Sequence, residues 1–206
     1  MEHILKYFPQ LSERQRQQLQ VLLEAYPEWN AKINVISRKD IDNLEVNHVL
    51  HSMAIAKFLQ FTPGTRILDL GAGGGFPSVP LALLFPEVSF LLVDRVGKKL
   101  RVAADVAERA DLKNVAVQHG DIKEVKGCFD FVVSRAVMPF PEMVPLVRRL
   151  IDRTGRNAMP NGVICLKGGD LSEELRPFKK QVLVDELTNY FDEEYFQTKK
   201  IVYLPL

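Results

Sequence analysis

Residues 68–82 of the chain read LDLGAGGGFPSVPLA, an apolar run that ends in a glycine-rich turn and two prolines. The glycines include the pattern G-x-G-x-G at Gly71, Gly73 and Gly75. A dinucleotide-binding turn has G-x-G-x-x-G, but this chain has Phe76 where the third glycine is required. A phosphate loop is excluded as well, because no Lys-Ser or Lys-Thr pair follows. We expect a loop that passes beneath a small ligand without phosphates, and the amino-acid end and sulfonium of S-adenosylmethionine fit that description.

The two prolines lie where we predict the next helix to begin. That helix covers residues 77 to 85 approximately, so Pro77 and Pro80 fall within its first turn. The first four backbone N–H groups of a helix have no partner inside it, so a proline there loses little. The prolines are therefore compatible with a helix start, and their fixed φ stiffens the exit from the loop.

From residue 66 the sequence alternates short β-rich runs with helical stretches. The predicted strands are RILDLG, SFLLVD, VAVQHG, FDFVVS and GVICLK, and further helices are predicted at about 97–110 and 139–152. This alternation favours a parallel sheet covered by helices on both faces. The tail from residue 181 offers two more strands, which we expect to close the sheet as an antiparallel pair.

Residues 1–60 lack this alternation and read as helical. Ser12 and Gln15 have the spacing of a capping box at a helix start, and a second helix is predicted from about Asp40 to Leu59. No repeat and no low-complexity linker separates this part from the rest. We therefore predict an N-terminal helical cap, residues 1–60, docked on an α/β domain, residues 61–206, as one compact unit.

Acidic residues end two of the predicted strands. In a doubly wound sheet the ligand lies at the carboxyl ends of the strands, where an acid after the second strand accepts hydrogen bonds from ribose hydroxyls. Asp94 has this position. Asp121, with the backbone of Ile122 and Lys123, stands at the end of the next strand, where an adenine amino group and ring edge would be recognised.

Composition excludes few functions. The chain has 206 residues, a formal charge of +1 and 47% apolar residues, as in ordinary globular proteins, so any nucleic-acid surface must be a local patch. Cys128 and Cys165 lie in strand-like runs, which predicts buried, inert thiols in a reducing compartment. No segment is long and apolar enough to span a membrane or resembles a targeting signal, so we expect a cytoplasmic protein. No cluster of His and Cys predicts a metal site.

The residues resemble a known family, the bacterial 16S rRNA guanine-N7 methyltransferases, historically called glucose-inhibited division protein B, within the class I S-adenosylmethionine-dependent methyltransferases. The resemblance covers nearly the whole chain. Its markers are WNAKINVIS around Asn34, HVLHS from His48, ILDLGAGGGFPSVPLA, LLVDRVGKKLRV, VVSRAV around Arg135, and LKGG from Lys167. It implies a Rossmann-like, doubly wound, mostly parallel seven-stranded sheet.

The resemblance also implies which residues hold S-adenosylmethionine. In that family the donor lies against the first glycine of the loop and the bulky residue after it, here Gly71 and Phe76, and the match extends to Ile122 with Lys123 and to Arg135. Two departures are visible. The chain has Pro77-Ser78 where the family commonly has Pro-Gly, and His48-x-x-His51-Ser52 where many members have His-x-x-Asp-Ser.

The chemistry implied by the resemblance agrees with the residue pattern. Guanine N7 carries a lone pair and no proton, so in-line attack on the donor methyl needs no general base. The histidines are scattered, and none is plainly placed as a catalytic base, so no catalytic residue is assigned. His48 and His51, three apart on one predicted helix face, suit hydrogen bonding at the mouth of the site.

Cations are clustered in two segments. DRVGKKLR brings Arg95, Lys98, Lys99 and Arg101 to the start of one helix at the rim of the donor pocket, and RRLIDRTGR contains Arg148, Arg149, Arg153 and Arg156. We predict that the first cluster binds RNA phosphates. Asn34, His48 and Lys167, from the family motifs, complete the predicted RNA-binding set.

Three functions are weighed. The first is an rRNA methyltransferase that works as a monomer on 16S rRNA, either naked or in the small ribosomal subunit. The second is an oxidoreductase that binds a nicotinamide dinucleotide, which Phe76 and the glycine spacing oppose. The third is a non-catalytic RNA-binding or ribosome-assembly factor, which the intact loop, Asp94 and Arg135 oppose. The exact target nucleotide stays open.

Overall fold

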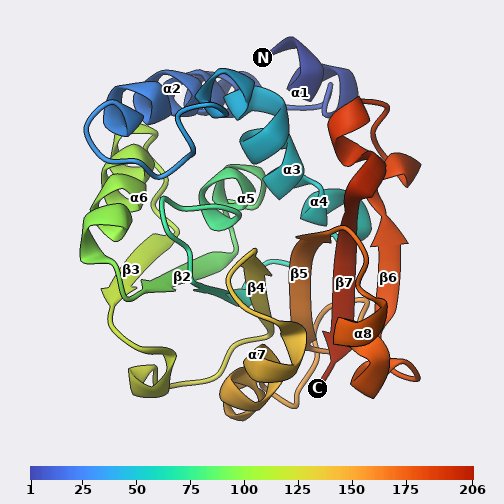
Figure 1. Cartoon of the computed structure of the whole chain (residues 1–206). Coiled ribbons are helices and arrows are strands. Elements are labelled where there is room, and N and C mark those ends of the chain that lie inside the picture. Colours follow the sequence, from blue (N-terminus) through green and yellow to red (C-terminus); the bar gives the residue numbers. More distant parts are fainter.

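A computed structural model describes all 206 residues and has a seven-stranded sheet at its centre (Figure 1). The strand order is β3-β2-β1-β4-β5-β7-β6. The strands are β1 (Arg66–Leu70), β2 (Ser89–Asp94), β3 (Val115–His119), β4 (Phe131–Arg135), β5 (Gly162–Gly168), β6 (Leu183–Glu186) and β7 (Lys199–Pro205). Neighbours among β1 to β5 pair in parallel, whereas β7 runs antiparallel to β5 and β6. The predicted mostly parallel sheet with an antiparallel end is confirmed.

Helices cover both faces of the sheet, as predicted for a doubly wound fold (Figure 1). One face carries α5 (Ser78–Leu84) and α6 (Gly97–Arg109), and the other carries α7 (Phe140–Val147) and the short α8 (Ser172–Leu175). The helix predicted over 139–152 ends earlier, in the 3-10 turn η4 (Arg148–Leu150), because Ile151 forms a parallel bridge with Phe129. Further 3-10 turns are η3 (Ile122–Glu124), η5 (Arg176–Phe178), η6 (Leu187–Asn189) and η7 (Glu194–Thr198).

The N-terminal part begins with α1 (Glu2–Tyr7) and α2 (Glu13–Asn30). The capping box predicted at the start of α2 is present: the Ser12 hydroxyl accepts from the Gln15 backbone N–H at 3.3 Å, and the Gln15 side chain accepts from the Ser12 N–H at 2.9 Å. Each side chain thus satisfies a helix-end N–H group that has no intrahelical partner. In Figure 1 the two helices lie across the upper side of the molecule, above α5 and α6.

The helix predicted from about Asp40 to Leu59 is broken into four segments. These are the 3-10 turn η1 (Ile41–Asn43), the π-helix η2 (Leu44–Leu50) and the short helices α3 (His51–Met53) and α4 (Ile55–Phe58). A π-helix is rare and occurs mostly as a local widening near functional sites. The wider turn of η2 places Asn47 and His48 beside the carboxyl end of β4, where both accept hydrogen bonds from Arg135.

The cap and the sheet share one hydrophobic core. Leu22 and Tyr26 of α2 and Met53 of α3 are buried in the same apolar cluster as Ile67 of β1 and Phe90 of β2. A smaller cluster lies on the opposite face, beneath α7 and α8. The apolar face of the cap therefore packs directly on the helices and strands that carry the glycine loop.

The two cysteines differ from each other in burial. Cys165 is buried in β5, as predicted, and burial raises the pKa of its thiol to about 12. The prediction that Cys128 is buried is wrong, because β4 begins only at Phe131 and the preceding turn leaves the Cys128 side chain exposed. None of the helices combines the length and the apolar character that a membrane-spanning helix requires.

Candidate functional site

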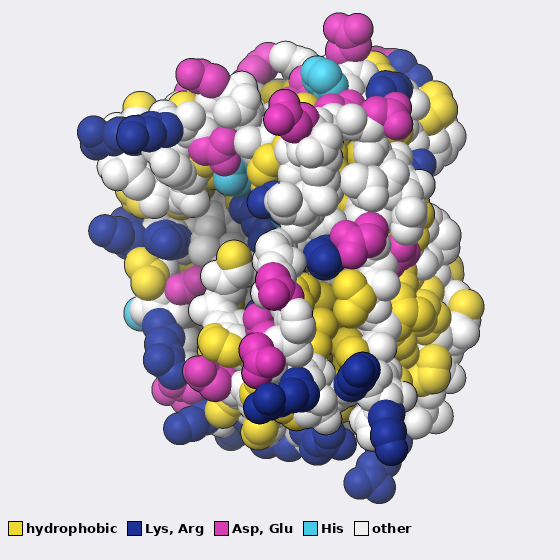
Figure 2. Space-filling model, turned by 45° about the vertical axis from the view of Figure 1, so that its right-hand side comes forward, with side chains coloured by type: hydrophobic (Ala, Val, Ile, Leu, Met, Phe, Trp, Pro, Cys, Tyr) yellow, Lys and Arg dark blue, Asp and Glu magenta, His cyan; other side chains and the backbone are white.

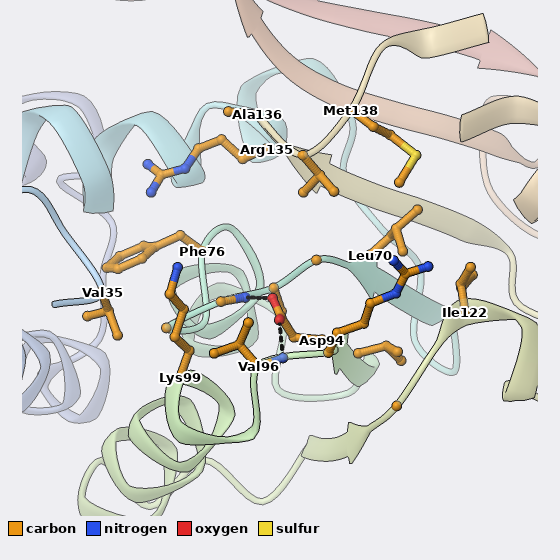
Figure 3. Close-up of a pocket in the computed structure, with 18 residues that line it drawn as sticks. Val35, Leu70, Phe76, Asp94, Val96, Lys99, Ile122, Arg135, Ala136 and Met138 are labelled. Atoms are coloured by element: carbon orange, nitrogen blue, oxygen red, sulfur yellow. Dashed lines mark hydrogen bonds between the residues drawn. The ribbon is translucent and has the colours of Figure 1, made fainter. Parts of the chain in front are cut away.

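A cavity of about 590 Å³ opens at the carboxyl ends of β1 to β4 (Figure 3). It lies where the strand order reverses between β1 and β4, the usual ligand position in an open α/β sheet. Its volume is within the range of small-molecule sites, about 300–1,000 Å³. The lining residues come from the ends of β1, β2 and β4, from the segments that follow β1 to β4, and from the cap: Val35, Leu70, Gly71, Ala72, Gly73, Gly74, Phe76, Val93, Asp94, Arg95, Val96, Lys99, Gly120, Ile122, Arg135, Ala136, Val137 and Met138.

The glycine loop forms the floor of this cavity and has little room for side chains. Gly71 has a φ of +70°, and a Cβ there would lie 2.4 Å from a methyl group of Val137. A Cβ at Gly74 would lie 2.7 Å from the Cβ of Val35, which belongs to the cap. Glycine is thus required at positions 71 and 74 because Val137 and Val35 leave no space for a Cβ. The positive φ of Gly71 also favours glycine.

The end of the loop is tied back to β1. The buried carboxylate of Asp69 accepts a hydrogen bond from the Ser78 N–H at 3.1 Å, at the first residue of α5. Burial raises the pKa of Asp69 to about 7. Pro77 is the residue before the helix, and Pro80 is the third helical residue. Pro80 therefore lies in the first turn of α5, as predicted, whereas Pro77 is the residue immediately before the helix.

Asp94 holds the position predicted for a ribose-binding acid. Its Oδ2 accepts from the Gly73 N–H at 2.8 Å and its Oδ1 from the Val96 N–H at 2.7 Å, the two bonds drawn in Figure 3. These bonds fix the plane of the carboxylate at the cavity wall. Each carboxylate oxygen accepts more than one hydrogen bond, so both retain capacity for a ligand hydroxyl.

The segment after β3 adds the apolar side chain of Ile122 to the cavity. The Ile122 N–H makes no hydrogen bond within the protein. Asp121 and Lys123 do not line the cavity: the Asp121 carboxylate accepts from the Lys123 N–H at 2.9 Å and pairs with Arg95. Of the predicted adenine-recognising group, the structure brings only Ile122 to the cavity wall.

Arg135 is the last residue of β4, and its side chain lies above Phe76 in Figure 3, with the guanidinium carbon 4.9 Å from the ring centroid. Its Nη1 donates to the Asn47 carbonyl at 3.3 Å and its Nη2 to His48 Nδ1 at 3.0 Å. Burial lowers the pKa of Arg135 from its ordinary value, yet no carboxylate lies within 4.0 Å of the guanidinium. No carboxylate therefore forms an ion pair with Arg135, although the charges of Asp69 and Asp40 favour its protonated form from a greater distance.

The role of His48 in RNA binding stays a prediction, and in the structure its ring bonds to groups of the protein. His48 stands behind Arg135 with both ring nitrogens occupied, because Nε2 lies 2.6 Å from Asp40 Oδ2. Burial and the charge of Arg135 lower the pKa of His48 to about 4. His51 is buried as well, with Nδ1 3.1 Å from the Tyr195 hydroxyl. Neither histidine is among the residues that line the cavity.

Lys167, predicted as an RNA contact, bonds to protein groups in the structure. Its side chain is only 10% exposed, and its Nζ lies 2.5 Å from Glu174 Oε1 and 2.9 Å from the Met138 carbonyl. The same Glu174 oxygen accepts from the Phe140 N–H at 2.6 Å. Lys167 therefore stabilises the loop between β4 and α7, which lines the cavity.

Of the four cations predicted at the cavity rim, Arg95 and Lys99 line the cavity. Lys98 and Arg101 are exposed, Lys99 lines the cavity, and none of the three is ion-paired, whereas Arg95 pairs with Asp121. Asn34 is exposed in the loop after α2, where its side chain accepts from Arg38. Figure 2 shows Lys and Arg side chains gathered along the left-hand edge of the face it presents.

Several residues that line the cavity were not predicted from the sequence. Val35 comes from the cap, and Ala136, Val137 and Met138 follow Arg135. Ala136 has a φ of +52°, which turns the chain sharply after β4. Their apolar side chains carry no chemical signal of their own, although Val35 and Val137 stand within the quoted motifs WNAKINVIS and VVSRAV. In the structure, no group of three or more His, Cys, Asp or Glu side chains is placed to hold a metal ion.

A family model described as rRNA small subunit methyltransferase G matches residues 15–201. The chain belongs to this family. It is 57% identical over 203 residues to the ribosomal RNA small subunit methyltransferase G of Bacteroides thetaiotaomicron, covering 98% of both chains. It is 58% identical to the protein of the same description from Porphyromonas gingivalis, covering 100% of this chain and 93% of the relative.

Solved structures agree on the fold. The precorrin-6y C5,15-methyltransferase of Geobacter metallireducens superposes with a TM-score of 0.57 at 16% identity, over 84% of this chain and 93% of that one. At this identity the likeness supports the architecture alone. Sheet order, cavity position and this likeness together place the chain in the class I methyltransferase fold.

Proposed function

We propose that the protein transfers a methyl group from S-adenosylmethionine to N7 of a guanine in 16S ribosomal RNA. The observation that carries the proposal is the gathering of Gly71, Asp94, Ile122 and Arg135 around one cavity at the carboxyl ends of β1 to β4. Membership of the rRNA small subunit methyltransferase G family supports the methyl donor and the class of RNA.

The cavity fits the nucleoside half of the donor. The Asp94 carboxylate, oriented by the Gly73 and Val96 N–H groups, is placed to accept from both ribose hydroxyls. The unbonded N–H of Ile122 is placed to donate to a ring nitrogen of adenine, and the Ile122 side chain packs on the ring. Asp121 acts from outside the cavity wall by holding the turn that carries Ile122.

The opposite end of the cavity fits the amino-acid half of the donor. The glycine turn leaves room for a ligand against the backbone of Gly71, and Phe76 forms one wall. Arg135 carries a positive charge that forms no ion pair with a protein carboxylate, and it is placed to bind the donor carboxylate. A charge-assisted bond of this kind is stronger than a neutral hydrogen bond.

The donor, when bound, supplies an electrophilic methyl group. Guanine N7 has a free lone pair and no proton to lose, so the chain has no proton to remove from the attacking atom. Its residues must instead fix the donor and the guanine in line, and such positioning contributes up to about 7–11 kcal/mol to rate acceleration. Phe76 and Arg135 limit the directions from which a base reaches the cavity.

The RNA is held by the cations at the rim in this proposal. Lys98 and Arg101 are exposed and unpaired beside the cavity, and Lys99 reaches into it, so phosphates of a bound RNA meet free ammonium and guanidinium groups. Asn34 extends this surface from the loop after α2. The protein acts as a monomer in the cytoplasm, where small ribosomal subunits are assembled.

The test is transfer of a labelled methyl group from S-adenosylmethionine to isolated small subunits and, separately, to naked 16S rRNA, followed by nucleoside analysis. We expect the label in 7-methylguanosine. Asp94→Ala serves as the control that removes the ribose contact. Label in any other nucleoside contradicts the assigned reaction, and absence of transfer to both substrates favours a non-catalytic assembly factor.

A further inference from the structure

Arg135 is oriented by two neutral acceptors that are adjacent in sequence. Its Nη1 donates to the Asn47 backbone carbonyl at 3.3 Å and its Nη2 to His48 Nδ1 at 3.0 Å. Both residues belong to the π-helix η2. An acceptor without charge fixes the direction of a guanidinium and leaves its positive charge available to a ligand. What holds these two acceptors in place therefore decides where Arg135 points.

Asp40 is hydrogen-bonded to both acceptor residues. Its Oδ1 accepts from the Asn47 side-chain amide at 2.7 Å, and its Oδ2 lies 2.6 Å from His48 Nε2. Asp40 does not line the cavity. It forms no hydrogen bond or ion pair with Phe76 or Arg135, so its contacts reach the cavity through Asn47 and His48, while its charge acts on Arg135 from a greater distance.

The His48 ring transmits this influence through its tautomer. A guanidinium has donors only, so Nδ1 of His48 must be an unprotonated acceptor to bond with Arg135. The ring proton is then on Nε2, which donates to Asp40. Without an acceptor at position 40, the ring is free to carry its proton on Nδ1, where it would oppose the Nη2–H of Arg135.

We infer that Asp40 is a positioning residue for Arg135, acting through the His48 tautomer and the Asn47 side chain. The inference rests on the proposed function, in which Arg135 binds the carboxylate of the methyl donor. Asp40 lies 95 positions before Arg135 in the sequence, at the end of the loop that carries Val35 into the cavity. The cap thus contributes to donor binding through a residue outside the pocket.

A purely structural role for Asp40 makes a different prediction. Asp40 also accepts from the Asn43 side chain at 3.2 Å, so it braces the start of the segment that includes η1 and η2. A brace affects the stability of the free protein. A positioning residue affects the affinity for the donor, and its effect depends on His48.

The test uses Asp40→Asn, which keeps the shape of the side chain. An amide has one acceptor oxygen, so it cannot accept from both Asn47 and His48 as the carboxylate does. The dissociation constant of S-adenosylhomocysteine is measured by calorimetry, with the melting temperature of the free protein recorded in parallel. We expect binding about 10-fold weaker, corresponding to about 1.4 kcal/mol. Asp42→Asn is the matched control: it removes the same charge from an exposed side chain that forms no hydrogen bond, and should leave affinity within about 2-fold.

A double-mutant cycle tests the route through His48. His48→Asn places an amide oxygen close to the position of Nδ1, and this acceptor has no tautomer to select. In the His48→Asn background, Asp40→Asn should weaken binding by only about 3-fold or less. Equal effects in both backgrounds would overturn the inference. If Asp40→Asn does not fold, His48→Phe removes the Nδ1 acceptor through which Asp40 is inferred to act on Arg135 and should weaken binding about 10-fold; unchanged binding in that variant would overturn the inference.

Arg135→Ala separates this inference from the proposed function. If it leaves the affinity for S-adenosylhomocysteine unchanged, Arg135 does not bind the donor, and both the proposed role and the inference fail. If it weakens binding while Asp40→Asn matches the wild type, the inference alone is overturned. The expected result is that Asp40→Asn adds no further loss in the Arg135→Ala background, because the group that Asp40 positions is then absent.

Discussion

The hydroxyl of Tyr26 donates a buried hydrogen bond of 2.9 Å to the backbone carbonyl of Gly74. It joins the middle of the helical cap to the glycine loop, and the two residues are 48 positions apart in the sequence. The Tyr26 ring also packs on Phe76, with centroids 4.5 Å apart. The cap is therefore part of the floor of the cavity, and changes in it are expected to reach the donor site.

Tyr26→Phe should weaken both folding and donor binding. It deletes the hydroxyl and leaves the Gly74 carbonyl without its partner, which costs about 1 kcal/mol of unfolding free energy. Affinity for S-adenosylhomocysteine should fall a few-fold, since the loop loses a fixed point. Tyr203→Phe is the matched control: its hydroxyl donates to the Pro160 carbonyl at 2.6 Å, away from the cavity. If Tyr203→Phe also lowers the affinity for S-adenosylhomocysteine, the loss in Tyr26→Phe is not specific to the glycine loop.

The shared core leads us to propose that residues 1–60 and 61–206 unfold as one unit. Leu22, Tyr26 and Met53 of the cap lie in the same cluster as Ile67 of the sheet, so removal of the cap exposes an apolar face to water. We expect one thermal transition for the whole chain, with calorimetric and van't Hoff enthalpies equal. A chain of residues 61–206 should lack a cooperative transition. Two separate transitions in the intact chain would contradict the proposal.

The fold was predictable from the sequence because its signals are local. Each strand is a short apolar run, and each of Gly71, Asp94 and Arg135 stands at or directly after the end of one. Parallel strands place their carboxyl ends at one edge, so the neighbourhood of these residues follows from topology alone. The capping box at Ser12 is local in the same sense.

The placement of side chains whose partners are distant in the sequence could not be predicted. His48 is hydrogen-bonded to Arg135, which lies 87 positions later in the sequence. The orientation of the His48 ring depends on the π-helix η2, which the spacing of apolar residues did not predict. Lys167 is bound by Glu174 and by the Met138 carbonyl, and neither bond follows from the LKGG motif. Cys128 lies in an apolar run that begins before the strand does.

Gly71→Ala should damage the donor site through a specific clash. The new Cβ would lie 2.4 Å from Val137 at a φ of +70°, so we expect a loss of about 1–3 kcal/mol in stability and no measurable donor binding. Gly127→Ala is the control for backbone strain alone, because Gly127 has a φ of +93° with no atom within 4 Å. Adding Val137→Ala to Gly71→Ala should recover part of the stability. If stability does not recover, the strained backbone at position 71, and not the clash with Val137, causes the loss.

Asp69 should make stability fall as pH rises. Burial raises its pKa from the ordinary 3.8 to about 7 in the folded protein, so between these values the folded state binds the proton that the unfolded state has lost. The contribution is fully present below about pH 4 and is lost as pH rises to about 7. Asp69→Asn removes this dependence, and its stability relative to the wild type should grow over that interval by at most about 4 kcal/mol. Chemical denaturation at several pH values measures it. A difference in stability between Asp69→Asn and the wild type that stays constant with pH would contradict the assignment.

The unpaired cations at the start of α6 should set the salt dependence of RNA binding. Replacing Lys98, Lys99 and Arg101 by alanine removes three phosphate contacts in the proposed complex, and each contact contributes roughly 0.7–0.9 to the slope of log K against log salt. We expect the slope to flatten by about 2 to 3 and the affinity for S-adenosylhomocysteine to change little, apart from any contact of Lys99 in the cavity. The matched control replaces Lys113, Arg148 and Arg153, which are exposed and precede β3 and β5, at the opposite edge of the sheet. Both triple variants lose the same net charge. Their slopes of log K against log salt should therefore differ only if RNA binds locally at the start of α6. Equal flattening in the two would mean that RNA responds to the overall charge and not to the rim of the cavity.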